Sequence, residues 1–125
     1  MKIFKMLAAL IFVALPPAQA DMKTYFENGK VQTDVTDESS KSYYQSGQLS
    51  TVIPQQNGEP DGKAQTFYES GKLMSEMEYK EGFIVGVTKE YYENGKLKRE
   101  HDRTSGAWKT YDETGKVTGE GVDQF

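Results

Sequence analysis

Hydrophobic and aromatic residues occur along most of the chain in short runs of about six to eight residues, separated by polar, glycine-containing stretches. The runs are rich in Tyr, Phe, Val and Thr, which favour β-strands. After residue 20, no stretch keeps the 3.6-residue apolar period of an amphipathic helix over three turns. Runs of this length and composition predict strands. We therefore expect an all-β fold.

One eight-residue word occurs five times, as TYFENGKV, SYYQSGQL, TFYESGKL, EYYENGKL and TYDETGKV. Each copy places Glu or Gln and then a small polar residue before a glycine. Lys or Gln and then Leu or Val follow it. Successive glycines are 18, 24, 24 and 20 residues apart. Self-similarity at such a period is typical of repeat architectures. The predicted turn glycines are Gly29, Gly47, Gly71, Gly95 and Gly115.

The word predicts a strand, a tight turn and the start of a second strand. Asn-Gly is the preferred pair for a two-residue type I′ turn, so for the Asn-Gly words we expect this loop, in which Tyr92 faces Leu97. Ser-Gly and Thr-Gly fit a three-residue loop better, because only the glycine is then left-handed. The register of those units stays open.

A second set of glycines marks the opposite ends of the strands. Gly62, Gly86 and Gly106 each lie five residues before an aromatic residue, and Gly58 and Gly82 precede the first two by four residues. Two turns per unit make the chain zigzag. We expect a single-layer, elongated antiparallel sheet of stacked β-hairpins, with nine or ten strands and a length of roughly 45 Å.

The first twenty residues differ from the rest. Lys2 and Lys5 precede an uncharged apolar run of ten residues, about half of the ~20 that a membrane-spanning helix needs. Small residues follow at Ala18 and Ala20, as signal peptidase requires. The sequence predicts a cleaved signal-peptide helix over 1–20, a repeat domain over 21–125, and an exported protein that is periplasmic or secreted.

Charge and composition limit the classes of partner and the kinds of chemistry that the sequence allows. Without Lys2 and Lys5 the chain has thirteen basic and nineteen acidic residues, a net charge of −6, and no basic patch. We therefore expect no nucleic-acid partner. The apolar run is too short to span a membrane and is predicted to be removed by cleavage, so we also expect no transmembrane anchor after cleavage. The chain has no cysteine, which excludes disulfides, thiol catalysis and thiolate metal sites.

Catalytic and cofactor chemistry is not expected. His101 is the only histidine, and in a strand it points away from the face that carries Glu100 and Asp102. We interpret it as part of a solvated, charge-paired strand end. An acidic cluster at Asp34, Asp37 and Glu38 lacks the spacing of a calcium loop. The sequence also has no phosphate-binding loop and no nucleophile elbow. We predict a non-enzyme without cofactor or metal.

The word YYENGKL, with Gly-x-x-x-Gly between copies, resembles the MORN-variant repeat of bacterial proteins. The likeness covers about residues 24–119 and is most complete over 62–78 and 82–100. The resemblance implies stacked hairpins without catalytic machinery. It also implies interaction or membrane-tethering roles, and antitoxin components of toxin–antitoxin modules are among the family's members.

Adjacent aromatic residues in a strand point to opposite faces, so stacked repeats predict two aromatic ladders. One ladder is expected to pack, and the other to face a partner in a sheet without a second layer. The favoured hypothesis is a protein scaffold. An antitoxin or immunity protein and a carbohydrate-binding module are alternatives, and the open sheet edges could pair with another copy. The candidate interaction face comprises Tyr25, Tyr43, Tyr44, Phe67, Tyr68, Tyr91, Tyr92, Trp108 and Tyr111.

Overall fold

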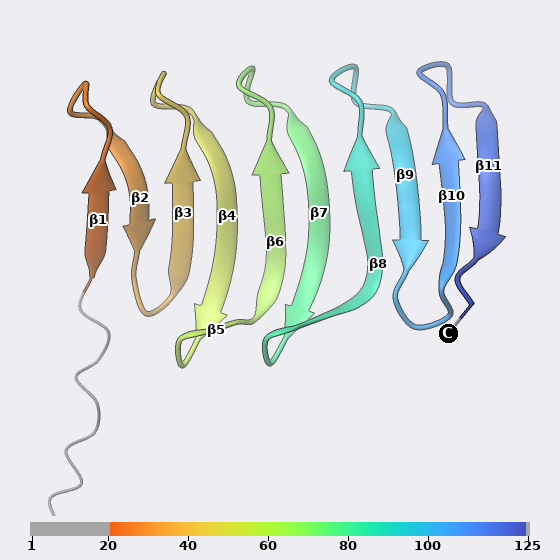
Figure 1. Ribbon diagram of the computed structural model, residues 1–125, viewed down its shortest axis with the longest axis horizontal. Helices are drawn as coiled ribbons and strands as arrows, with labels where there is room; N and C mark the ends of the chain where they lie inside the picture. Colours follow the sequence, from red (N-terminus) through yellow and green to blue (C-terminus); the bar gives the residue numbers. More distant parts are fainter. Residues whose placement is uncertain (1–20, 125) are drawn as a thin grey trace, which may run out of the picture.

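The structure is a computed structural model that describes residues 21–124, and the predicted signal peptide with its cleavage site lies outside these residues. The described chain forms strands joined by turns (Figure 1). The strands are β1 (Met22–Tyr25), β2 (Val31–Val35), β3 (Ser39–Tyr43), β4 (Leu49–Gln56), β5 (Glu59–Pro60), β6 (Gly62–Phe67), β7 (Leu73–Lys80), β8 (Phe83–Tyr91), β9 (Leu97–Asp102), β10 (Ala107–Tyr111) and β11 (Val117–Val122).

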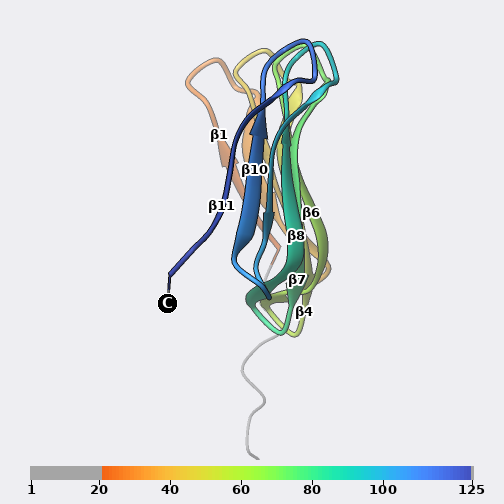
Figure 2. The same ribbon diagram turned by 90° about the vertical axis from the view of Figure 1, so that its right-hand side faces the viewer.

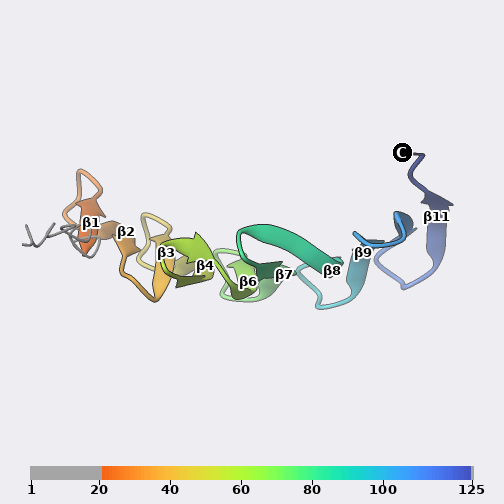
Figure 3. The same ribbon diagram turned by 90° about the horizontal axis from the view of Figure 1, so that it is seen from below.

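These strands make one open antiparallel sheet, in which ten follow one another in chain order and the two-residue β5 pairs with β4. Figure 2 shows the sheet edge-on as a single thin layer, and Figure 3 shows the same ribbon from below. Gly106 aside, only Ala64, at 4% exposed, and His101, at 9%, are buried in the described part. The predicted all-β stack of hairpins is confirmed, and most side chains lie on a surface.

The five word glycines all form the same kind of turn, and these turns join the strands at the same end of every hairpin (Figure 1). In the fourth repeat, the Gly95 N–H donates to the Tyr92 carbonyl at 2.9 Å and the Tyr92 N–H donates to the Lys96 carbonyl at 2.8 Å. This is a three-residue loop in which only the glycine, at φ +85°, is left-handed.

The prediction of a two-residue turn for the Asn-Gly words was wrong. Leu97 faces Tyr91 rather than Tyr92. Asn94 keeps negative φ, and its Oδ1 accepts the Lys96 N–H at 2.9 Å, a bond that holds the wider loop. The asparagine therefore contributes through its side chain and not through a left-handed backbone.

Type I′ turns do occur, but at the opposite ends of the strands. Asn57 and Gly58 have φ values of +54° and +79°, and the flanking residues Gln56 and Glu59 pair directly. Glu81 and Gly82 form the equivalent turn between β7 and β8, with φ values of +50° and +83°. These two loops contain the only non-glycine residues with positive φ among the residues that the structure describes.

Glu81 carries a backbone strain that its counterpart Asn57 largely avoids, because asparagine tolerates the left-handed region better than glutamate. We expect Glu81→Asn to raise the free energy of unfolding by roughly 0.5–1 kcal/mol in urea denaturation. Glu93→Asn, in a turn position with negative φ, is the matched control and should leave stability within about 0.5 kcal/mol of the original. Equal effects of the two substitutions would contradict the strain.

The first connection between repeats lacks the glycine pair and closes in another way. The Thr36 N–H donates to the Ser39 carbonyl at 2.8 Å, and the Thr36 hydroxyl accepts the Ser39 N–H at 3.1 Å. A threonine side chain thus completes the short turn between β2 and β3.

Candidate interaction surface

The register of the strands sorts the side chains into rows that cross the whole sheet, because directly paired residues of neighbouring strands lie on the same face. One row consists mainly of charged residues of alternating sign. We call the face that carries it the charged face. In order from β1 to β11 the row is Lys23, Asp34, Lys41, Val52, Gln65, Glu76, Lys89, Glu100, Lys109 and Glu120.

The opposite face, which we call the hydroxyl face, carries a neighbouring row of mostly Ser and Thr. Hydroxyls of directly paired residues hydrogen-bond one another, at 2.6 Å for Thr24 and Thr33 and at 2.6 Å for Thr66 and Ser75. The row is Thr24, Thr33, Ser42, Thr51, Thr66, Ser75, Glu90, Arg99, Thr110 and Gly119.

The first aromatic residue of each word lies two positions after the charged row and therefore on the charged face. Two of these tyrosines donate to glutamates of that row. The Tyr91 hydroxyl is 2.9 Å from Glu76 Oε1, and the Tyr111 hydroxyl is 2.6 Å from Glu100 Oε1. The five residues are Tyr25, Tyr43, Phe67, Tyr91 and Tyr111, and Tyr25 is 58% exposed.

Tyr91 should ionise only at unusually high pH. Burial, the hydrogen bond to Glu76 and the charge of Glu76 raise the pKa of Tyr91 to about 12. Because this lies above the ordinary value of 10.0, the folded state keeps its full Tyr91 contribution below about pH 10 and loses it as pH rises toward 12. Spectrophotometric titration of the phenolate band should show a late step that Tyr91→Phe removes and Tyr25→Phe retains. Loss of that step in Tyr25→Phe alone would contradict the assignment.

The second aromatic residue of the middle repeats connects each repeat to the next. The hydroxyls of Tyr44, Tyr68 and Tyr92 donate to main-chain carbonyl oxygens at 2.7, 2.7 and 2.8 Å. The acceptors are the carbonyls of the first aromatic residues one repeat further on, Phe67, Tyr91 and Tyr111. Each ring therefore spans the strand between donor and acceptor, and the three bonds join repeats that are adjacent in the stack.

The end repeats depart from this pattern. Phe26 has no hydroxyl at the equivalent position of the first repeat. In the fifth repeat the position is Asp112, whose Oδ1 accepts the N–H groups of Thr114 and Lys116 at 2.9 and 3.0 Å. The Thr114 hydroxyl and these N–H groups hold the pKa of Asp112 below its ordinary value. Asp112 thus closes its own turn and does not reach toward a further repeat.

Two of the turns also bond to the turn that follows. In the first repeat, Asn28 Nδ2 donates to the Gln45 carbonyl at 3.2 Å, and Lys30 Nζ donates to the Ser46 carbonyl at 2.9 Å. In the fourth repeat, Asn94 and Lys96 make the same bonds to the fifth turn, at 3.2 and 3.3 Å. The Asn-Gly-Lys words therefore join turns as well as strands.

A shallow groove of about 430 Å³ lies across β8 to β11 on the charged face. Its apolar part includes Val87 and Val122, which are 44% and 58% exposed. The groove is also lined by Glu100, Asp102, Lys109 and Glu120. A groove lined by apolar and mostly acidic side chains suits a segment that presents an apolar side chain flanked by positive charge. Sequence reasoning missed this groove, because it depends on the exact register of four neighbouring strands.

Trp108 packs against two glycines of the last strand. A Cβ atom built on Gly121 would lie 2.8 Å from Trp108 Cζ2, and one built on Gly119 would lie 3.3 Å from Cζ3. Both glycines are paired with residues of β10, Gly121 with Trp108 itself. The missing side chains make room for the indole over an edge strand, so Trp108 holds β11 against the sheet.

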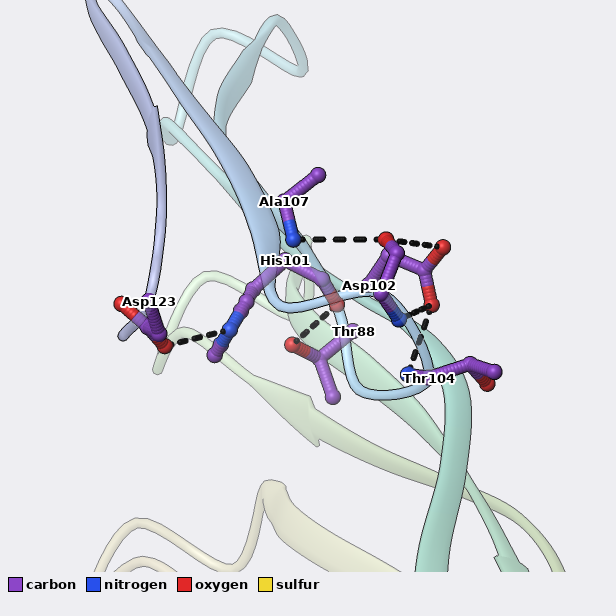
Figure 4. Close-up of polar contacts among 7 residues, drawn as sticks. Thr88, His101, Asp102, Thr104, Ala107 and Asp123 are labelled. Atoms are coloured by element: carbon purple, nitrogen blue, oxygen red, sulfur yellow. Dashed lines mark hydrogen bonds and ion pairs between the residues drawn. The ribbon is translucent and has the colours of Figure 1, made fainter. Parts of the chain in front are cut away.

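His101 is directed toward the end of the chain (Figure 4). Its Nε2 is 2.9 Å from Asp123 Oδ2, and the Thr88 hydroxyl donates to its carbonyl at 3.3 Å. The interpretation of His101 as solvated was wrong, since it is 9% exposed, although it is paired with a carboxylate. His101 is paired with Trp108, and Glu100 is paired with Lys109. Because His101 and Glu100 are successive residues of one strand, their side chains lie on opposite faces.

The acidic residues of the sequence analysis do not gather into a site. Asp34 lies in β2 and pairs with Lys23 at 3.3 Å, whereas Asp37 and Glu38 lie in the exposed turn that follows. Asp102 caps a turn by accepting the Thr104 N–H at 2.8 Å (Figure 4). It also accepts the Ser105 hydroxyl at 2.8 Å. Within residues 21–124 no three His, Cys, Asp or Glu side chains are arranged as metal ligands would be.

The comparisons with known proteins agree with this architecture. The MORN repeat variant family matches residues 19–36, 60–81, 84–102 and 105–122, well over half of the chain. The chain belongs to this family. MORN repeats are commonly protein- or membrane-interaction modules, and the family is generally non-enzymatic. No curated protein and no solved structure matches the chain.

The repeat around Gly47 lies outside the four matched segments, yet it folds as the others do. The Gly47 N–H donates to the Tyr44 carbonyl at 2.9 Å, and the Tyr44 N–H donates to the Gln48 carbonyl at 2.8 Å. The structure therefore contains five MORN-type hairpins in residues 21–124. That part of the chain includes no helix of the length and apolarity that crossing a membrane requires.

Proposed function

We propose that this MORN-repeat protein is an exported, non-catalytic interaction protein that holds a protein partner on the charged face. The observation that carries the proposal is the groove across β8 to β11, where Val87 and Val122 remain exposed beside the charged row. A single-layer sheet uses little of its surface for a core, and exposed apolar surface rimmed by polar groups is typical of docking sites.

The charges that line the groove favour one kind of partner. Glu100, Asp102 and Glu120 line the groove together with one lysine, Lys109. The chain without its predicted signal peptide also has six more acidic than basic residues. A partner segment with an apolar side chain between Lys or Arg residues would match both the groove and its charge. An exported toxin with a basic surface is one partner of this chemistry, which keeps the antitoxin or immunity hypothesis within the proposal.

Carbohydrate binding through the tyrosines is less well supported. The hydroxyls of Tyr44, Tyr68 and Tyr92 donate to the main chain, and those of Tyr91 and Tyr111 donate to glutamates. These donors are already used inside the sheet, whereas a sugar would need them. Five of the seven tyrosines proposed as an interaction face thus take part in holding the repeats together.

The test is to isolate proteins that bind the exported protein and to compare it with two variants. Val87→Glu places a charge in the groove, and Phe83→Glu makes the same kind of change at a residue that is 74% exposed and does not line the groove. We expect a partner that binds the original protein and Phe83→Glu, and that loses at least tenfold in affinity for Val87→Glu. Equal binding by all three proteins, or binding of none, would contradict the proposal. Binding of a glycan alone would favour the carbohydrate alternative.

A further inference from the structure

Within residues 21–124, the two outermost strands of the sheet, β1 and β11, carry the same kinds of residue as its internal repeat borders. Positions can be counted from the turn glycine of each repeat. The residue five positions after the glycine is acidic in every repeat but the second, and the residue six positions before it is lysine in every repeat but the third. The acidic set with its exception is Asp34, Val52, Glu76, Glu100 and Glu120, and the lysine set with its exception is Lys23, Lys41, Gln65, Lys89 and Lys109.

These two positions face each other wherever one repeat meets the next. Three of the four borders pair an acid with a lysine, and the fourth pairs the two exceptions. The borders are Asp34 with Lys41, Val52 with Gln65, Glu76 with Lys89, and Glu100 with Lys109. At the ends of the sheet, Glu120 on β11 and Lys23 on β1 occupy the same positions, with no further strand of the described chain beyond them.

A second copy placed along the sheet would complete this pattern. Figure 1 shows β1 and β11 at opposite ends and running in opposite directions, so β11 of one copy and β1 of the next would be antiparallel, as at every internal border. The internal register then places Lys23 of the second copy beside Glu120. Both side chains are accessible, at 49% and 65% exposed. Charge alternation along the row would continue from one copy into the next.

The hydroxyl face is compatible with the same register. Thr24 of the second copy would lie beside Gly119, in the row where Thr33 meets Ser42 at an internal border. Met22 of the second copy, which is 56% exposed, would lie beside Gly121, the glycine covered by Trp108. An exposed apolar side chain would thereby gain an aromatic neighbour.

We infer that copies of this protein associate head to tail, with β11 of one molecule pairing with β1 of the next. The backbone groups of the two edge strands supply the hydrogen bonds, and the pair of Lys23 with Glu120 sets the register. Because the contact is heterologous and the sheet does not close, the product is an open-ended ribbon and not a symmetric dimer.

The junction between copies is weaker than three of the four internal borders, and the fifth repeat shows why. Internal borders that follow Tyr44, Tyr68 and Tyr92 gain a hydroxyl bond to the next repeat, whereas Asp112 closes its own turn. Association is therefore reversible and depends on concentration. Asp112→Tyr restores the missing donor and should tighten association about fivefold, the value of one ordinary hydrogen bond.

Sedimentation velocity over a range of concentrations tests the inference. The full-length chain is produced in an exporting host and purified as that host processes it. We expect the average mass of the original protein to rise with concentration beyond that of a dimer. Lys23→Glu and Glu120→Lys each place like charges at the junction and should weaken association at least tenfold. Circular dichroism confirms that each variant is folded.

Mixing the two variants provides the decisive control. In the mixture, the lysine introduced by Glu120→Lys meets the glutamate introduced by Lys23→Glu, so the two charges of that junction are exchanged and still opposite. The other mixed junction keeps Glu120 with Lys23, and association should therefore return to nearly the original level.

A third variant distinguishes association between copies from partner binding in the groove. Val87→Glu changes the groove and not the edges of the sheet, so it should associate as the original protein does. A protein that stays monomeric at all concentrations, single edge variants that associate normally, or a mixture that stays dissociated would each overturn the inference.

Discussion

Replacing Tyr68 with alanine should lower the free energy of unfolding by about 3 kcal/mol, as expected for removal of a packed aromatic ring. Tyr68 lies at the centre of the stack, where its hydroxyl donates to the Tyr91 carbonyl at 2.7 Å. Stability in a repeat protein is close to a sum of repeats and the borders between them. Loss of a central border should therefore also broaden the urea transition and lower its slope, because the two halves begin to unfold separately.

Substitutions between tyrosine and phenylalanine separate the contribution of the ring to stability from that of the hydroxyl. Tyr68→Phe keeps the ring and should cost about 1 kcal/mol, the usual value of one hydrogen bond. Phe26→Tyr adds a hydroxyl where the first repeat lacks one, and should gain a similar amount if it reaches the Tyr43 carbonyl. Tyr25→Phe is the control at an exposed tyrosine. A Tyr68→Phe variant as stable as the original would show that the hydroxyl does not join the repeats.

Gly121→Ala should lower the free energy of unfolding by about 2 kcal/mol, a cost typical of overpacking. The new methyl group would lie 2.8 Å from Trp108 Cζ2 and would push the indole away from β11. Because Trp108 is the only tryptophan, its fluorescence should shift to longer wavelength as the ring becomes hydrated.

The matched control for Gly121→Ala is Glu120→Ala, which changes the same strand on the opposite face. It should leave the Trp108 emission unchanged and cost less than about 0.5 kcal/mol. Glycine within a strand is ordinarily less favourable than alanine, so alanine at this position should stabilise unless the indole needs the space. Unchanged stability and emission in Gly121→Ala would contradict the packing of Trp108 on the edge strand.

The architecture was predictable because it depends on local signals that occur five times. Each word glycine has the left-handed backbone that the turn prediction required, with φ between +82° and +95°. Strand composition and the second set of glycines then gave the hairpin order. The five words also contain a signal for the common turn type. One position is shared by Asn28, Ser46, Ser70, Asn94 and Thr114, which suggests one turn type with a left-handed backbone only at the glycine.

The details of the surface were less accessible to sequence reasoning. A one-residue difference in loop length changes which residues face each other, so the charged and hydroxyl rows could not be derived until the register was known. The pair of His101 with Asp123 joins residues more than twenty positions apart across β10 and β11. The groove beside Val87 likewise requires four neighbouring strands. Such features follow from long-range pairing and not from any short motif.

The most direct test of a single continuous layer is a distance between its two ends. The chain has no cysteine, so Glu27→Cys and Glu113→Cys in the first and fifth turns can be spin-labelled specifically. Double electron–electron resonance on labelled protein diluted with unlabelled protein should give a separation of about 40 Å, since four repeats of two strands lie between the turns. A separation below about 25 Å, as a sandwich or closed barrel would give, would contradict the account.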